Sequence, residues 1–382
     1  MEGSSPVLPI PTLGLSFQPH RKLVLAGGVW APYTAITSYP DKIDGKPAPQ
    51  RYSLITLDGS ALAVLGLYAA YAPTNDLRLG AGFEAMAGNF VSSVVMSACI
   101  PDRFACAPEQ PEWDVASELV VGPIFAPSGR FGAIWQFMKD WRAGAAVSLP
   151  FYIRAPATIR TRLPASAVFE RAKQSGEDAS VSFDLPWTLK LGVETRMVED
   201  LRVEAAFGFE KWAMHDQILV EPDGIALQDI AGFPKTYYIP DVVFPREFQD
   251  SWSLRLGGEY SFALGGYPLD LRAGLAYESS AVPPEYLSVL TLDSDKVTAA
   301  IGGSLHIGKW RLDATYARVF AADVTVDPRQ AKIAQISPVL ANPPASPDYV
   351  NGGDYSMRAD VLGVGITYQF EPAPVDVESE EP

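Results

Sequence analysis

The sequence has little of what catalysis and metal binding require. Its 382 residues include three histidines and two cysteines. His20, His215 and His306 are scattered, and neither a His-Glu-x-x-His pair nor a Gly-x-Ser-x-Gly turn occurs. We interpret each histidine as an ordinary polar residue. The sequence therefore predicts no catalytic residue, no metal site and no cofactor, and it argues against an enzyme such as a lipase.

Basic residues are also in deficit. Lysine and arginine number 30 against 45 aspartates and glutamates, which gives a formal net charge of −15. A protein that binds nucleic acid needs a basic surface, because it must neutralise phosphates. Nucleic acid is therefore excluded as a partner.

Long apolar runs are absent as well. A membrane-spanning helix needs roughly 18 consecutive apolar residues, and the nearest approach, residues 61–72, is shorter and rich in glycine and alanine. A soluble protein and a transmembrane β-barrel both fit this absence, because a barrel spreads its apolar signal over many short strands. The first residues carry neither the basic segment nor the apolar core of a signal peptide.

What the sequence contains instead is alternation with a period of two. Residues 252–260 and 269–277 place apolar side chains at every second position and mostly polar or charged ones between them. Side chains alternate across a strand, so this region is a hairpin with one apolar and one charged face. Aromatic residues at the ends of the apolar face are typical of a transmembrane barrel strand. A soluble antiparallel sandwich also alternates, and it stays open as an alternative.

The connections between such segments favour the barrel. Short turns such as Asn75-Asp76, Lys139-Asp140 and Glu199-Asp200 alternate with long loops along the chain, as in outer-membrane barrels. We predict an all-β, antiparallel transmembrane barrel over residues 1–370 and an acidic, disordered tail over residues 371–382. The thirteen expected strands are residues 9–17, 23–33, 61–71, 77–85, 115–137 (interrupted at Pro123 or Pro127), 141–149, 185–195, 201–209, 252–260, 269–277, 296–307, 310–316 and a last one that ends at Phe370.

Strand parity predicts a missing piece. A short, periplasmic turn follows the first visible strand, so that strand must run inward, and closed bacterial barrels usually have an even number of strands. We therefore expect about fourteen strands, one of them upstream of Pro9. An absent N-terminal segment would also explain why no signal peptide is visible.

Charges in the predicted strands lie at polar-face positions, and their signs are mixed. Facing lipid they would be costly at mid-depth, whereas facing a lumen they can pair. They are Arg78, Glu84, Arg142, Lys190, Glu194, Arg202, Glu204, Arg255, Glu259, Asp270, Arg272, Arg311 and Asp313.

The two cysteines flank a short polar stretch between two strands. No histidine lies near Cys99 and Cys106, and two thiolates alone do not complete a zinc shell. We therefore expect a disulfide in an outer loop, which implies an oxidising compartment.

An ordered series of motifs resembles the FadL-type outer-membrane transporters, which take up long-chain fatty acids and aromatic hydrocarbons. Residues 248–252 (Phe-Gln-Asp-Ser-Trp) and 255–257 (Arg-Leu-Gly) are similar to the family's F-K-D and R-x-G. Residues 271–283 are similar to its R-x-G-x-x-x-D-x-S-P-V-P, and residues 292–296 to its P-D-x-D-R. The resemblance covers residues 9–370.

The resemblance implies a barrel of about fourteen strands that is plugged by an N-terminal hatch; the hatch and first strand are absent from this sequence. It implies that hydrophobic ligand enters at an outer groove, reaches an inner pocket and leaves sideways where one strand kinks inward. The lysine of F-K-D, which can meet a ligand carboxylate in relatives, is Gln249 here, with Arg246 close by. Arg246 and Gln249 are therefore the candidate ligand-binding residues.

The strand that aligns with the kinked one ends in residues 29–33. Pro32 has no N–H and cannot donate to a ladder. Gly27 and Gly28 would let the backbone bend and leave room for an acyl chain. Either Pro32 simply begins the long loop, or Gly27, Gly28 and Pro32 line a lateral opening that faces the lipid.

Together these features predict a monomeric uptake channel for hydrophobic molecules in the bacterial outer membrane. Its expected partners are a hydrophobic small-molecule ligand, outer-membrane lipid and the barrel assembly machinery, which would bind the C-terminal strand that ends at Phe370. A general porin for small polar solutes and a soluble β-sandwich binding module remain as alternatives.

Overall fold

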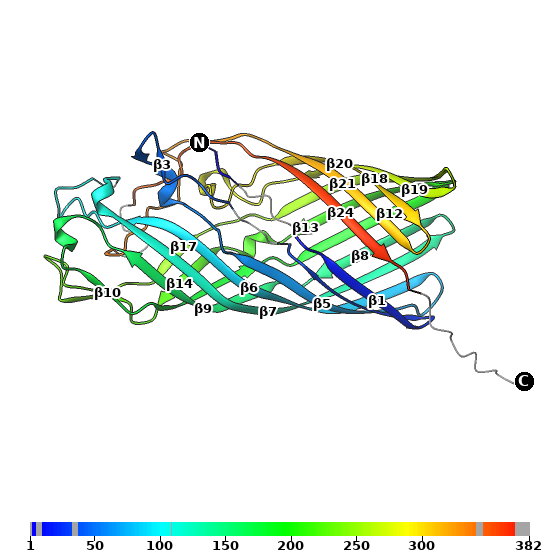
Figure 1. The fold of residues 1–382 in the computed structure, drawn as a ribbon, viewed down its shortest axis with the longest axis horizontal. Coiled ribbons are helices and arrows are strands. Elements are labelled where there is room, and N and C mark those ends of the chain that lie inside the picture. The colour runs from blue at the N-terminus through cyan, green and yellow to red at the C-terminus, as the bar shows by residue number, and fades with distance from the viewer. Residues whose placement is uncertain (1, 5–9, 33–36, 108, 341–346, 371–382) are drawn as a thin grey trace, which may run out of the picture.

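The computed structural model describes residues 2–4, 10–32, 37–107, 109–340 and 347–370 (Figure 1). Within these ranges the protein is built from strands, and 17 of them form one antiparallel sheet. The strands run obliquely around the molecule, with the short turns at one end and the long loops at the other (Figure 1). No helix in these ranges is long and apolar enough to cross a membrane.

The barrel wall follows chain order. Each strand pairs with the next, as the alternation of short turns and long loops predicts. In the described residues these thirteen strands are β1 (Leu13–His20), β2 (Leu23–Trp30), β5 (Ala61–Tyr71), β6 (Leu77–Ser97), β7 (Asp114–Met138), β8 (Trp141–Ser148), β12 (Thr188–Val198), β13 (Leu201–Glu210), β18 (Ser251–Leu264), β19 (Tyr267–Glu278), β20 (Lys296–Ile307), β21 (Trp310–Ala321) and β24 (Arg358–Tyr368).

Four further strands extend the wall at the long-loop end, where the sequence predicts only long loops. That prediction is wrong for residues 150–179 and 211–248, because β9 (Phe151–Arg162), β11 (Asp178–Leu185), β14 (Gln217–Pro222) and β17 (Val242–Pro245) pair in succession beyond β7. The remaining short elements are β3 (Lys42–Ile43), β4 (Lys46–Pro47), β10 (Lys173–Ser175), β15 (Ala226–Gln228), β16 (Thr236–Tyr238), β22 (Val324–Val326), β23 (Gly353–Tyr355) and the 3-10 helices η1 (Pro49–Tyr52), η2 (Pro111–Trp113), η3 (Ala167–Phe169), η4 (Trp212–Met214) and η5 (Pro284–Tyr286).

The outward face of the wall is apolar and exposed. Leu254, Leu256 and Leu275 are 53%, 58% and 60% exposed, although they sit in the middle of paired strands. Aromatic side chains mark the two rims of this belt, as expected where a barrel meets the two membrane interfaces. They include Tyr71, Trp135, Tyr267, Trp310 and Tyr368 at the short-turn end, and Trp252, Tyr277 and Phe320 at the long-loop end.

The inward face carries paired charges. Glu84 is 1% exposed, accepts a hydrogen bond from the Tyr68 hydroxyl at 2.6 Å and pairs with Arg130 at 2.8 Å. Glu194 pairs with Arg142 at 2.6 Å. Because a lone charge in a low-dielectric wall is costly, this pairing explains why both signs occur at the polar positions of the strands.

Two expectations about the ends of the chain stay predictions. In the described ranges no ladder joins β1 to β24, and this edge is where a further strand would fit. The predicted acidic tail, residues 371–382, lies outside the described residues, and so does residue 9, the start of the first predicted strand.

The two faces of β21 can be tested at neighbouring positions. Ala314 faces outward and Thr315 inward, at mid-strand. Ala314→Arg should lower the free energy of unfolding by about 2–4 kcal/mol, because the new charge faces lipid near mid-depth. Thr315→Arg should cost clearly less, since its side chain enters the charged lumen. Denaturant titration of the full chain in lipid vesicles measures both, and equal losses would contradict the assignment of the faces.

Candidate ligand cavity

An apolar cavity of about 340 Å³ lies inside the wall at the long-loop end, at the lower end of the roughly 300–1,000 Å³ of small-molecule pockets. It is lined mainly from β6, β7, β9, β11, β14 and β17, with Leu62 from β5. In the described residues no group of three or more His, Cys, Asp or Glu side chains could hold a metal ion. The apolar lining includes Leu62, Met86, Phe90, Val94, Leu119, Val121, Ile124, Ile153, Ile159, Val181, Phe183, Ile218, Val220, Val242, Phe244 and Ile336.

The cavity begins where the inward-facing side chains of β6 and β7 change from charged to apolar. On β6, Glu84 is followed two positions later by Met86; on β7, Arg130 gives way to Ala126 and Ile124. The lumen is therefore charged between the short turns and this level, and apolar beyond it. A hydrophobic ligand is stabilised only in the second part, because burying apolar surface there removes it from water.

Two neighbouring strands reverse their inward and outward faces at different heights. On β7 an extra residue at Gly122-Pro123 stands opposite Asn89 of β6, and such a bulge shifts the alternation by one position. In the segment that runs from β8 into β9, the reversal comes at Pro150. Odd-numbered residues point outward before it, as Leu149 does at 42% exposure, and inward after it, as buried Phe151 and Ile153 do.

Between the two reversals, inward-facing residues of β7 stand opposite outward-facing residues of the β8–β9 segment, and the two do not pair. Ladder pairs join Arg130 to Ser148 and Val121 to Ala157, but none joins residues 122–128 to residues 150–156. Pro123 and Pro127 also lack the N–H that a ladder requires. We call these two stretches the β7–β9 seam. The predicted interruption of the strand at Pro123 or Pro127 is wrong for β7 itself, which is continuous; what stops there is its pairing.

The seam borders the cavity directly. Ile124 and Ile153, one from each side of the seam, line the cavity. The side chains next to them in sequence, Phe125 and Tyr152, are 65% and 55% exposed on the outer surface. One unpaired layer of wall therefore separates the cavity from the outside.

Arg246 places a buried positive charge at the cavity. It follows β17, and its backbone N–H donates to the Asp216 carbonyl at 2.7 Å. The side chain is 6% exposed, and no described residue forms an ion pair or hydrogen bond with its guanidinium. Burial lowers the pKa of Arg246 to about 10, so the group is still protonated at neutral pH. A charge buried without a partner is costly, which points to a partner that arrives with a ligand.

His215, read as an ordinary polar residue in the sequence, is 6% exposed and also lines the cavity. Its Nδ1 lies 2.8 Å from the Asp184 carbonyl oxygen, which can only accept, so Nδ1 carries the proton. The rings of Phe183, Trp212 and Phe248 surround it. Burial lowers the pKa of His215 to about 4, so the imidazole is neutral at neutral pH.

Gln249 does not lie at the cavity. Its side-chain Nε2 donates to the Ser280 carbonyl at 3.4 Å, and its backbone N–H donates to the Ala281 carbonyl at 2.8 Å. The structure thus separates the two candidate ligand-binding residues: Arg246 lines the cavity, and Gln249 holds a neighbouring loop. The aspartate of the same motif, Asp250, pairs with Lys211 at 2.7 Å, so this part of the motif is also structural.

The strand with the predicted lateral opening is regular. Gly27 and Gly28 sit in unbroken ladders with β1 and β5. A Cβ at Gly27 would touch only the tip of Leu67 at 3.3 Å and the Gly66 carbonyl at 3.6 Å. A Cβ at Gly28, on the opposite face of the strand, would lie 2.9 Å from the Leu13 carbonyl. Pro32 lies beyond the end of β2 and is exposed. An opening at these residues stays a prediction.

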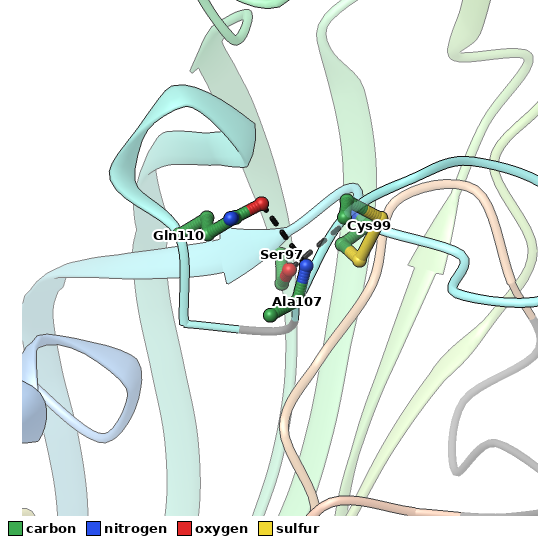
Figure 2. The surroundings of a disulfide bond; sticks show 5 residues. Ser97, Cys99, Ala107 and Gln110 are labelled. Carbon is green, nitrogen blue, oxygen red and sulfur yellow. Dashed lines mark hydrogen bonds between the residues drawn. A yellow bond between two sulfur atoms is a disulfide. The ribbon is translucent and has the colours of Figure 1, made fainter.

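Cys99 and Cys106 form a disulfide at the long-loop end, with an S–S distance of 2.07 Å. Figure 2 shows the bridge beside two hydrogen bonds that fix its loop: Cys99 N–H donates to Ser97 Oγ at 3.3 Å, and Ala107 N–H donates to Gln110 Oε1 at 3.0 Å.

An apolar, exposed outer belt, a charged lumen and an apolar cavity beyond it define an outer-membrane barrel that accommodates hydrophobic molecules. The chain belongs to the outer membrane protein transport protein (OMPP1/FadL/TodX) family, whose model matches residues 3–370. This confirms the resemblance seen in the sequence. The protein is thus a bacterial outer-membrane transporter of a family that carries hydrophobic substrates, which decides against a soluble sandwich and a general porin.

Solved structures share the fold. A FadL homologue from Pseudomonas aeruginosa is 16% identical, with a TM-score of 0.70 over 95% of this chain and 78% of that chain. The toluene transporter TodX from Pseudomonas putida is 17% identical, with a TM-score of 0.57 over 83% and 78%. The toluene transporter TbuX from Ralstonia pickettii is 17% identical, with a TM-score of 0.54 over 82% and 76%. No curated protein sequence matches the chain.

The unpaired charge of Arg246 predicts an unusual stability effect. Because the folded-state pKa lies below the ordinary value of 12.5, the charged form opposes folding at every pH below about 10. Arg246→Met should therefore raise the free energy of unfolding of the ligand-free protein by about 3 kcal/mol, since one pKa unit corresponds to about 1.4 kcal/mol. Denaturant titration tests this, with Arg171→Met at an exposed arginine as the control. A destabilised Arg246→Met protein would contradict the assignment.

Proposed function

We propose that the protein takes up long-chain fatty acids or closely related hydrophobic acids, rather than aromatic hydrocarbons, across the outer membrane. One observation carries this choice: a protonated guanidinium is buried at an apolar cavity, and no described residue neutralises it. An ionised carboxylate supplies both the missing charge and hydrogen-bond acceptors, and its acyl chain fits the apolar lining. An uncharged hydrocarbon would leave Arg246 unpaired.

The polarity of the cavity supports a ligand with one charged end. Arginine binds carboxylates through two parallel N–H donors, and such charge-assisted hydrogen bonds are about twice as strong as neutral ones. The surrounding aliphatic and aromatic side chains favour the remainder of the molecule by burying it. The acid is thereby held head first against residue 246, with its chain along β6, β7 and β9.

Binding of tetradecanoate to the purified protein tests this function. Arg246→Met should weaken binding on the order of tenfold or more, since a hydrogen bond to a charged group contributes about 1.5–3 kcal/mol. Arg246→Lys should retain part of the affinity, because an ammonium keeps the charge without the planar fork. Isothermal titration in detergent measures all three proteins. Wild-type affinity in Arg246→Met would refute the role of this residue, and toluene binding without acid binding would refute the substrate class.

Release of the ligand is proposed to be lateral, through the β7–β9 seam. Support comes from its missing ladder pairs, which leave no backbone ladder to break between residues 122–128 and 150–156, and from its position between the cavity and exposed Phe125. The opening predicted at Gly27, Gly28 and Pro32 is the competing route.

Bulky labels on single cysteines distinguish the two routes. Three variants each place one cysteine on the outer surface. Phe125→Cys places it at the seam, Gly27→Cys on regular β2, and Phe131→Cys on a fully paired part of β7. After reaction with a bulky maleimide, only the label at residue 125 should stop fatty-acid uptake by cells, because it alone covers the exit. A block only at residue 27 would place the opening on β2. Undiminished uptake in all three labelled proteins would contradict lateral release.

A further inference from the structure

The cavity contains two buried polar groups of opposite hydrogen-bonding character. Arg246 can only donate. His215 is neutral, and its Nδ1–H is already given to the Asp184 carbonyl at 2.8 Å, so its remaining nitrogen, Nε2, can only accept. In the described part of the chain, no group donates a hydrogen bond to Nε2.

The surroundings of His215 cannot satisfy this acceptor. Three aromatic rings pack around the imidazole, and their centroids lie 5.0–6.1 Å from its own. The one ring with an N–H is Trp212, and its Nε1 donates to Glu210 at 2.8 Å instead. His215 lines the cavity, so only a molecule inside the cavity can donate to Nε2. A ligand that displaces water from this acceptor without replacing its hydrogen bond pays an energetic cost, so the cavity favours a ligand that carries a donor.

We propose that His215 Nε2 accepts a hydrogen bond from a hydroxyl group on the ligand, and that the preferred cargo is a hydroxylated fatty acid whose hydroxyl lies near its carboxylate. This inference rests on the proposed function, because Arg246 must hold the carboxylate for His215 to meet the hydroxyl. An acid without the hydroxyl enters the same cavity but leaves Nε2 unpaired. His215 therefore determines specificity, while Arg246 provides the affinity for acids in general.

A purely structural role for His215 makes a different prediction. In that case the residue matters only because Nδ1–H ties η4 to β11 through Asp184. Asparagine separates the two roles, since its amide N–H can occupy the position of Nδ1 while nothing replaces Nε2. Phenylalanine removes both nitrogens and keeps a ring among the aromatic neighbours.

The experiment compares tetradecanoate and 3-hydroxytetradecanoate by isothermal titration with the purified full-length protein at neutral pH. The wild type should bind the hydroxy acid about five to ten times more tightly, the effect of one additional neutral hydrogen bond. His215→Asn and His215→Phe should both reduce this ratio to about one. Arg246→Met should weaken both acids and leave too little binding for a preference. His20→Asn, at an exposed turn, is the matched control and should keep the wild-type ratio.

The outcomes separate the two claims. A wild-type ratio near one, or a wild-type ratio that survives in His215→Asn, overturns the role of Nε2 while leaving fatty-acid uptake standing. Loss of the preference in His215→Phe but not in His215→Asn assigns His215 to the tie with Asp184 and also overturns it. Absence of binding of both acids to the wild type overturns the proposed function itself.

Discussion

The structure depends on one geometric constraint: side chains of a strand alternate between two sides, so a barrel strand can serve lipid and lumen only while its phase is kept. Along most of the wall the phase is constant, and neighbours pair residue by residue. Where β7 and its neighbour shift phase at different heights, pairing fails between residues 122–128 and 150–156. The seam is thus a direct consequence of two one-residue shifts in adjacent segments, each beside a proline.

The same strands divide the interior into two environments. The buried charges that line the lumen next to the membrane belt are paired, as Glu84 is with Arg130 and Glu194 with Arg142. Beyond the shift in β7 the inward side chains are apolar, and there Arg246 has no counter-ion among the described residues. The contrast is what makes Arg246 informative: this protein neutralises its other buried charges, so an exception at an apolar cavity points to a charged ligand.

How much the sequence predicts depends on whether a feature is local. Alternation and turn residues are local, so the strands at residues 61–71 and 296–307 have the predicted borders. The sequence pattern does not reveal β9 and β11, because Pro150 and Pro186 separate them from β8 and β12 and the alternation changes phase there. The aspartates of the motif at residues 292–296 also have a local, structural role: Asp293 and Asp295 accept hydrogen bonds from the N–H groups of Ala281 and Ser280 at 2.8 Å.

The cavity itself is not local. Leu62, Ile153 and Ile336 meet only through the register of many strands, which no single segment encodes. Motif position suggested both Arg246 and Gln249, but only burial separates them. A lone histidine gives no sign in the sequence of whether it is buried, so the sequence alone predicts an ordinary polar role for His215.

The central claim is that the Arg246 guanidinium receives the carboxylate of the ligand, and the charge state of the bound ligand tests it most directly. Tetradecanoate labelled with ¹³C at its carboxyl group reports its own titration by NMR when bound to the protein. A cation in contact with a carboxylate favours the ionised form, whereas an apolar cavity alone favours the neutral form. The account predicts that the pKa of the bound acid lies below that of the free acid. A pKa raised above the free value would show that the head group lies in apolar surroundings away from Arg246, and would contradict the account.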